Sequence, residues 1–166
     1  MTDRAPQSRV GIGLDVHSFA PGRRLVLGGV EVRYEQGLAG HSDGDALAHA
    51  IVDALLGAAG RGDIGQWFPS DDSRFAGADS LSLLRTVAQT LRHEGWRIVN
   101  VDATVIAEQP RLAEHLPVMR SRLAEAIGVG PEDFSVKATT VDGLGALGRA
   151  EGIAAQAVAL ITRNEK

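Results

Sequence analysis

Apolar and polar positions follow two different periods along this chain, and each period predicts a different kind of element. Four segments are predicted to be strands, at residues 10–17, 98–107, 134–141 and 151–162. The alternation is regular in residues 98–107, where four apolar side chains are expected to face inward: Val99, Val101, Ala103 and Val105. Residues 151–162 are rich in alanine and would also suit a helix. Gly28 and Gly29 separate two short apolar runs, which predicts a β-hairpin over residues 25–32.

A spacing of three to four residues between apolar positions predicts three helices, at residues 43–60, 79–95 and 117–128. The side chains expected to be buried are Leu47, Ile51, Leu55 and Ala58 in the first helix, Leu81, Leu84, Ala88 and Leu91 in the second, and Met119, Leu123 and Ile127 in the third. Ser42 or Asp43 is expected to cap the first helix, with Asp45 in its first turn. Asp79 is expected to cap the second helix, and Pro117 fits the first position of the third.

The alternation of strands and helices indicates the α/β (α+β) class. We expect a mixed four-stranded sheet with the helices packed on one face, plus the small hairpin. The remaining segments are expected to be loops, at residues 34–40, 61–78, 108–116 and 142–148, and the second of them is long enough for a functional lid. Residues 1–8 are expected to form a disordered tail and residues 9–163 a single domain. Because the helices cover only one face of the sheet, oligomerisation should bury the other.

Composition narrows the kinds of function that are possible. The 166 residues are 44% hydrophobic and 23% charged, which is typical of one globular domain. A formal net charge of −4 gives no reason to expect nucleic acid or a membrane as a partner. The absence of cysteine excludes disulfides and thiolate metal sites, so any metal must be held by nitrogen and oxygen. No signal peptide or bilayer-spanning segment is recognisable, and a cytoplasmic location is expected.

A candidate metal site involves the segment GHSDGDALAH at residues 40–49, a predicted turn that leads into the first helix. Asp15 and His17 share a face of the preceding strand, because residues two apart in a strand point the same way. Together with His49, they form the kind of three-ligand set that holds zinc with one open position. The same residues also fit an unrelated group of polar surface side chains, and spacing alone leaves both interpretations open.

Two further acidic residues, Asp45 and Asp53, share a helical stripe with His49, each four residues from the next. Asp45 is either an outer partner that orients His49 or part of a solvated face. For Asp53 we expect the solvated face.

The sequence KATTVD at residues 137–142 ends a predicted strand with hydroxyl groups and a carboxylate. The threonine hydroxyls suit phosphate and Asp142 suits Mg²⁺, although a polar, capped strand end has the same composition. Arg149 in the following glycine-rich segment would also suit a phosphate. Residues 143–148 match G-x-G-x-x-G, but the helix and acidic residue that a dinucleotide site requires do not follow. No P-loop sequence is present.

Taken together, five stretches resemble the 2-C-methyl-D-erythritol 2,4-cyclodiphosphate synthase family of the non-mevalonate isoprenoid pathway. These stretches are DVH at residues 15–17, HSDGD at 41–45, GDIG at 62–65, KATT at 137–140 and GRAEGI at 148–153. They occur in the expected order, and the resemblance extends from about Arg9 to Ile161.

The resemblance implies an enzyme that converts 4-diphosphocytidyl-2-C-methyl-D-erythritol 2-phosphate to the 2,4-cyclodiphosphate and releases CMP. It implies a homotrimer with active sites between neighbouring subunits and the sheets facing the central axis. It also implies Zn²⁺ on Asp15, His17 and His49, and Mg²⁺ or Mn²⁺ on the substrate diphosphate facing Asp142. His41 and Thr140 would stabilise the transition state.

The residues that would contact the cytidine diphosphate substrate form several groups along the chain. They are Asp15, Val16 and His17; His41 and Ser42; Asp63, Ile64 and Gly65; Phe68, Pro69, Ser70, Asp71 and Asp72; Ala107, Glu108, Gln109, Pro110, Arg111, Leu112 and Ala113; Thr139, Thr140, Val141 and Asp142; and Arg149. Asp142 stands where the family usually has Glu, and its side chain is one methylene shorter.

Two other functions are compatible with the same residues. A zinc hydrolase would use the open metal position to activate water, with His41 or Asp63 as the general base. A trimeric ligand-binding protein would bind a phosphorylated small molecule without turning it over. Formation of a cyclic product separates the synthase from both.

Overall fold

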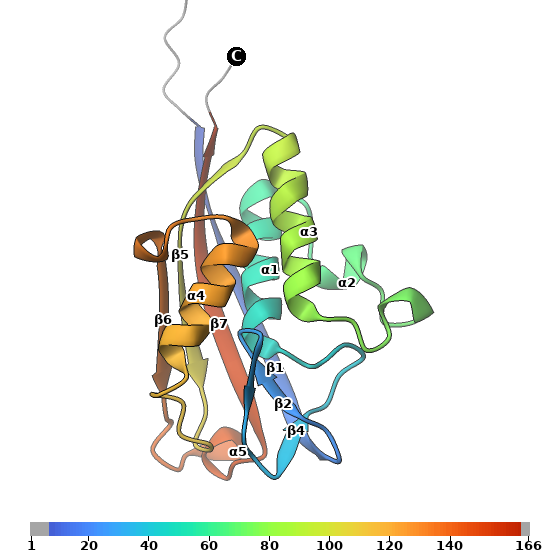
Figure 1. Cartoon of the computed structure of the whole chain (residues 1–166), viewed down its shortest axis with the longest axis vertical. Coiled ribbons are helices and arrows are strands. Elements are labelled where there is room, and N and C mark those ends of the chain that lie inside the picture. The colour runs from blue at the N-terminus through green and yellow to red at the C-terminus, as the bar shows by residue number, and fades with distance from the viewer. Residues whose placement is uncertain (1–6, 164–166) are drawn as a thin grey trace, which may run out of the picture.

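A computed structural model describes residues 7–163 as one curved sheet with helices layered over one face (Figure 1). The sheet has five strands in the order β4-β1-β7-β5-β6, with bounds β4 (Gln36–Leu38), β1 (Gln7–Pro21), β7 (Gly152–Arg163), β5 (Arg97–Ile106) and β6 (Phe134–Thr139). Only β5 and β6 run parallel, so the sheet is mixed, as predicted. In residues 7–163 no helix combines the length and hydrophobicity needed to cross a bilayer.

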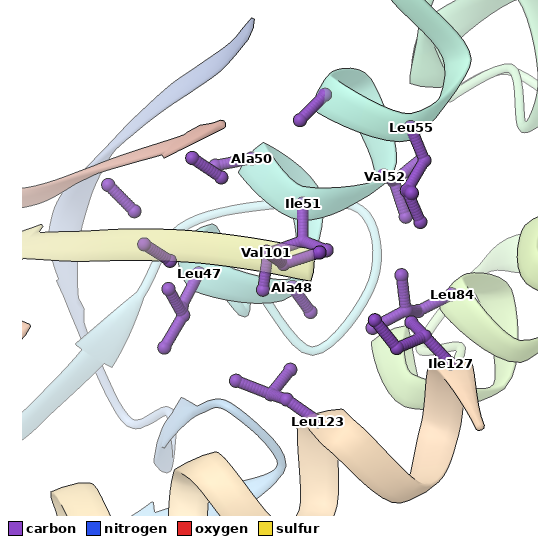
Figure 2. Close-up of a cluster of buried hydrophobic side chains, with 14 of the residues drawn as sticks. Leu47, Ala48, Ala50, Ile51, Val52, Leu55, Leu84, Val101, Leu123 and Ile127 are labelled. Carbon is purple, nitrogen blue, oxygen red and sulfur yellow. The ribbon is translucent and has the colours of Figure 1, made fainter. Parts of the chain in front are cut away.

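The three predicted helices are present as α1 (Ala46–Ala59), α3 (Ser80–His93) and α4 (Leu116–Ile127). Their apolar stripes meet the inner face of the sheet, and Figure 2 shows Leu47, Ile51 and Leu55 of α1 packed near Leu84, Val101, Leu123 and Ile127. The side chains predicted to be buried in these helices are buried in the structure. The predicted hairpin is also confirmed, as β2 (Leu25–Leu27) and β3 (Val30–Val32).

Several boundaries differ from the prediction. The sheet has a fifth strand, β4, in a segment expected to be a loop, because β1 extends far enough to pair Phe19 with Leu38. Two of the segments expected to be loops contain short helical turns: α2 (Ile64–Trp67), η1 (Ser73–Phe75) and α5 (Gly145–Gly148). A further short turn, η2 (Pro131–Asp133), connects α4 to β6. A register shift between Ile98 and Asn100 buries Ile98 in the position expected for Val99. Gln7 and Ser8 belong to β1 rather than to a tail, and residues 1–6 of the expected tail lie outside the described residues.

The face of β1 that carries its large apolar side chains is turned away from the helices. Val10, Ile12, Leu14 and Val16 are 58–66% exposed. On the inner face, a Cβ at Gly13 would lie 1.8 Å from the carbonyl oxygen of Ala50, so glycine is required for α1 to pack this closely. The packing of α1 on glycine leaves an apolar strip exposed on the outer face, which agrees with the expected uncovered sheet face.

The first helix begins later than expected, and Asp45 is its N-cap. Neither Ser42 nor Asp43 is the cap, and Asp45 does not orient His49. Its buried carboxylate accepts hydrogen bonds from the backbone N–H groups of Ala48 (3.0 Å), Gly28 (2.9 Å) and Gly29 (2.7 Å). Burial raises the pKa of Asp45, and these three donors oppose that effect. Asp45 therefore ties the turn of the β2–β3 hairpin to the start of α1.

Replacing Asp45 with Ala is expected to destabilise the protein by about 3 kcal/mol or more, because it leaves buried N–H groups of the helix and hairpin without an acceptor. Urea unfolding monitored by circular dichroism measures this change. As a control, Asp133→Ala at the exposed end of η2 removes a carboxylate without such bonds and should change stability by less than about 0.5 kcal/mol. Equal stability of the two variants would contradict the role given to Asp45.

Candidate functional site

Asp15, His17 and His49 come together where β1 packs against α1. Asp15 Oδ2 lies 2.7 Å from His17 Nε2 and 3.0 Å from His49 Nδ1, and the two ring nitrogens are 3.3 Å apart. One ligand atom of each residue lies within 4.8 Å of the other two, so a single ion can be reached by all three. The three residues, which spacing alone left unconnected, thus form one group that could hold a metal ion.

The outer nitrogen of each imidazole is held by a different partner. His17 Nδ1 contacts the backbone carbonyl of Ala39. His49 Nε2 lies 2.9 Å from Ser80 Oγ and 3.1 Å from Ser42 Oγ. These partners hold the rings so that their inner nitrogens face Asp15, as the outer partners of metal-binding histidines do.

The cluster favours positive charge. Burial raises the pKa of the Asp15 carboxyl, but hydrogen bonds from His17 and His49 outweigh burial and hold that pKa well below its usual range. The hydrogen bond to Asp15 in turn raises the pKa of the His17 imidazole. A carboxylate and two imidazole nitrogens that converge in this way match the oxygen and nitrogen ligands of Zn²⁺, so the residues fit a divalent metal.

A cavity of about 550 Å³ opens beside the cluster. Its lining includes the three cluster residues and eight further predicted site residues: His41, Ser42, Ile64, Gly65, Phe68, Pro69, Ser70 and Asp71. Phe75 and Leu83 also line it and were not predicted. Leu83 lies outside the apolar stripe predicted for α3. An apolar side chain in such a position is the feature of the sequence that could have identified Leu83 as a cavity residue.

Among the site residues predicted in segments 15–17, 41–42, 63–65 and 68–72, three do not line this cavity. Val16 lies on the exposed outer face of β1. Asp63 caps α2 through the N–H of Gln66, and Asp72 caps η1 and pairs with Arg74. Asp53, expected on a solvated face, is half-buried and accepts a hydrogen bond from the N–H of Ile64, which anchors the start of α2.

A second cavity, of about 310 Å³, lies at the carboxyl ends of β5 and β6. Eight residues predicted for the cytidine site line it: Ala107, Glu108, Pro110, Arg111, Leu112, Ala113, Thr139 and Thr140. Gln109, Val141 and Asp142 are not among the lining residues. Glu108 Oε2 lies 3.4 Å from the N–H groups of Val141 and Gly143, which links the two loops that carry these residues.

The predicted site is therefore divided into two parts within one chain. The Asp15–His17–His49 group belongs to β1 and α1, whereas the second cavity belongs to β5 and β6, and β7 lies between β1 and β5 in the sheet. Asp142 is not part of the Asp15–His17–His49 group. Thr140 Oγ1 lies 3.4 Å from Asp142 Oδ1, and Arg149 pairs with Glu151 at 2.6 Å.

Comparison with known proteins finds relatives that match almost the whole chain. The model of the YgbB family matches residues 8–162. A 2-C-methyl-D-erythritol 2,4-cyclodiphosphate synthase of Moorella thermoacetica is 56% identical over 95% of this chain and 96% of its own length. The structure of the bifunctional IspDF from Campylobacter jejuni superposes with a TM-score of 0.92 at 38% identity, over 97% of this chain and 44% of that one. A Plasmodium falciparum IspF in complex with CDP superposes with a TM-score of 0.84 at 30% identity, over 98% of this chain and 100% of that one.

Proposed function

This chain belongs to the YgbB family of 2-C-methyl-D-erythritol 2,4-cyclodiphosphate synthases, and from this premise we propose how its residues carry out the reaction. The substrate is 4-diphosphocytidyl-2-C-methyl-D-erythritol 2-phosphate, and the products are the cyclic diphosphate and CMP. The observation that carries the proposal is the convergence of Asp15, His17 and His49 beside a cavity large enough for the phosphorylated part of the substrate.

The reaction requires no nucleophile from the protein. An oxygen of the 2-phosphate attacks the β-phosphorus, the bond from that phosphorus to the oxygen bridging to the α-phosphate breaks, and CMP leaves with the bridging oxygen. The protein must hold two anionic groups close together and stabilise the charge on the transferred phosphoryl group. This agrees with a site of imidazoles, hydroxyls and carboxylates without a cysteine nucleophile.

We propose that Asp15, His17 and His49 hold Zn²⁺ and that Asp142 faces Mg²⁺ or Mn²⁺ carried by the substrate diphosphate. When bound, these ions supply positive charge to the phosphate oxygens. His41 and Ser42 line the same cavity from the turn before α1, which supports a contact of these two residues with the 2-phosphate. Ile64, Gly65 and the segment from Phe68 to Asp71 enclose the erythritol part.

We propose that the working form is a homotrimer in which each active site combines the metal cluster of one chain with the second cavity of its neighbour. The site residues are divided between β1 and α1 on one hand and the ends of β5 and β6 on the other, with β7 between them, and this division supports the arrangement. The exposed strip on β1, together with Val158, its β7 neighbour opposite Ile12, offers an apolar surface for the contact.

Replacing Thr140 with Ala is expected to reduce kcat by about 10²- to 10³-fold, because it removes a hydroxyl donor to the phosphoryl group in the transition state. KM should change little, since most contacts to the cytidine are retained. Steady-state assays of CMP release measure both constants. Thr86→Ala on the exposed side of α3 is the matched control and should behave as wild type. An unchanged kcat for Thr140→Ala would remove Thr140 from the mechanism.

The proposed function is tested by incubating the protein with the diphosphocytidyl substrate, Mg²⁺ and Zn²⁺, and identifying the products by phosphorus NMR. The synthase yields the cyclic diphosphate and CMP in equal amounts. Release of CMP with only linear phosphates would instead establish a hydrolase. Recovery of unchanged substrate would establish a binding protein.

A further inference from the structure

We infer that Arg23 is a positioning residue for the proposed reaction, because its guanidinium group holds the turn that carries His41 and Ser42. This inference rests on the proposed function, in which both of these side chains contact the substrate. Arg23 itself is not among the residues that line the cavity beside Asp15 or the second cavity. It acts from behind the turn, through the backbone.

The turn at residues 41–45 has little regular structure to hold it. It lies between β4 and α1, and its last residue, Asp45, is the N-cap of that helix. His41 is exposed, whereas Ser42 is buried. A segment without helix or sheet bonds keeps one conformation only where other contacts offset the lost conformational entropy. The direction of His41 and Ser42 therefore depends on the bonds that hold their backbone.

The peptide unit between Ser42 and Asp43 is bound at both ends. Its carbonyl oxygen, which belongs to Ser42, accepts a hydrogen bond from Arg23 Nη2 at 2.6 Å. Its N–H, which belongs to Asp43, donates to the carbonyl oxygen of Ala78 at 3.1 Å. A peptide unit is planar, so bonds at its two opposite ends fix the orientation of the whole plane. The charged guanidinium makes the first of these bonds stronger than one between neutral groups.

The preceding peptide unit, between His41 and Ser42, is held by the same loop as Asp43. The carbonyl oxygen of His41 accepts a hydrogen bond from the N–H of Gly77 at 2.9 Å. Gly77 and Ala78 therefore bind two groups of the turn, and Arg23 binds the carbonyl group that lies between them in the chain. Without Arg23, the carbonyl group of Ser42 would be free to rotate, and the Ser42 side chain with it.

The backbone of Arg23 is held in place by β4. A Cβ at Gly37 of β4 would lie 2.2 Å from the carbonyl oxygen of Arg24 and 2.7 Å from the carbonyl carbon of Arg23. Glycine thus allows this segment to pack directly on the strand. Leu25, two residues after Arg23, is buried in the core. The half-buried side chain of Arg23 therefore reaches Ser42 from a fixed point.

The adjacent residue, Arg24, has a different partner. Its Nη1 lies 3.0 Å from Glu31 Oε2 on β3, and the two side chains are 77% and 57% exposed. An exposed ion pair of this kind contributes little to stability. Arg23 and Arg24 therefore share residue type, charge and position in the chain, but Arg23 binds the turn and Arg24 binds the hairpin.

Loss of the bond from Arg23 is expected to affect the chemical step more than substrate binding. A misplacement of about 1 Å in a group that acts in the transition state lowers the rate by about 100-fold. Freedom of the turn should therefore lower kcat by about 10- to 100-fold. KM should change by less than about threefold, because the proposed cytidine and metal contacts come from other segments.

The test compares full-length Arg23→Met with Arg24→Met. Each variant is assayed for kcat and KM of CMP release, and the deuterium uptake of residues 41–45 is measured by mass spectrometry. Methionine keeps an apolar stem and removes the donor. Arg23→Met should show the fall in kcat and faster exchange in the turn, whereas Arg24→Met should match wild type in both. Arg23→Ala gives the same comparison if Arg23→Met fails to fold.

Wild-type kcat or wild-type exchange in folded Arg23→Met would overturn the inference. An equal loss in Arg24→Met would also overturn it, because it would indicate a general effect of charge. A rise in KM with unchanged kcat would show that Arg23 serves binding instead. If wild type formed no cyclic product, the proposed function would be wrong, whereas the exchange measurement would still decide whether Arg23 holds the turn.

Discussion

His49→Ala is expected to purify without stoichiometric zinc and to lose at least about a thousandfold in kcat/KM. The change removes one of three ligand atoms and leaves Asp15 and His17 at 2.7 Å from each other without the third. The loss corresponds to about 4 kcal/mol of charge stabilisation on the transferred phosphoryl group. Metal analysis of the purified protein and an assay of CMP release measure the two effects separately.

His93→Ala is the control for this prediction, because His93 is an exposed residue in the last turn of α3. It should retain one zinc per chain and full activity. Stoichiometric zinc in His49→Ala would refute the ligand assignment. Loss of zinc with undiminished activity would instead show that the metal is not needed for the cyclisation.

Ile12→Arg is expected to convert the assembly to single chains and to reduce activity by at least about a hundredfold. Ile12 lies in the centre of the exposed apolar strip on β1, opposite Val158 of β7. A buried arginine without a partner is strongly unfavourable at such a contact. Separation of the chains would divide the two halves of the site and remove the positioning on which the reaction depends. Analytical ultracentrifugation measures the mass, and an assay of CMP release measures the activity.

Val118→Arg is the control, since Val118 is another exposed apolar residue but lies on α4, away from the outer face of the sheet. It should leave the assembly and the activity as in wild type. A fully active, monomeric Ile12→Arg would contradict the shared site.

Mixing the two inactive variants His49→Ala and Thr140→Ala provides an independent test of the same arrangement. In a randomly mixed trimer, about a quarter of the sites would combine an intact metal cluster with an intact Thr140 from the neighbour. Dissociation and reassociation of the mixture should therefore restore activity, which neither variant has alone. No recovery in a mixture shown to exchange chains would place both halves of the site in one chain.

The local pattern of apolar and polar residues was sufficient to predict most of the helices and strands. The helical stripes of α1, α3 and α4 were predicted because the spacing of side chains along a helix is fixed by the backbone within a few residues. The same reasoning placed Asp15 and His17 on one face of a strand and His49 one turn into a helix. The shared metal cluster could therefore be proposed from sequence, although spacing did not establish that the strand and the helix meet.

The errors arose where a residue depends on a partner far along the chain. Strand β4 has only three residues, and it exists because the end of β1 pairs with it. Asp45 was expected to serve the helix or His49, but its carboxylate also binds two N–H groups of a hairpin turn 16 and 17 residues earlier. The Ser80 hydroxyl donates to Asp43, 37 residues away, and the sequence around Ser80 gives no sign of this contact.

The sequence by itself determined the class of fold, the three long helices and the family, because these depend on short-range periodicity or on contiguous motifs. It also singled out the three residues that we propose as metal ligands. Only the tertiary structure decided which face of β1 is covered. Alternation places Ile12 and its apolar neighbours on one face of the strand, but it does not say which face meets the helices. The close packing of α1 against Gly13 leaves Ile12 and its neighbours on the outer face. Only the tertiary structure, likewise, separated the two cavities along the sheet, one at β1 and the other at β5 and β6. It also gave His49 its outer partners, since these contacts join segments that are distant in the chain.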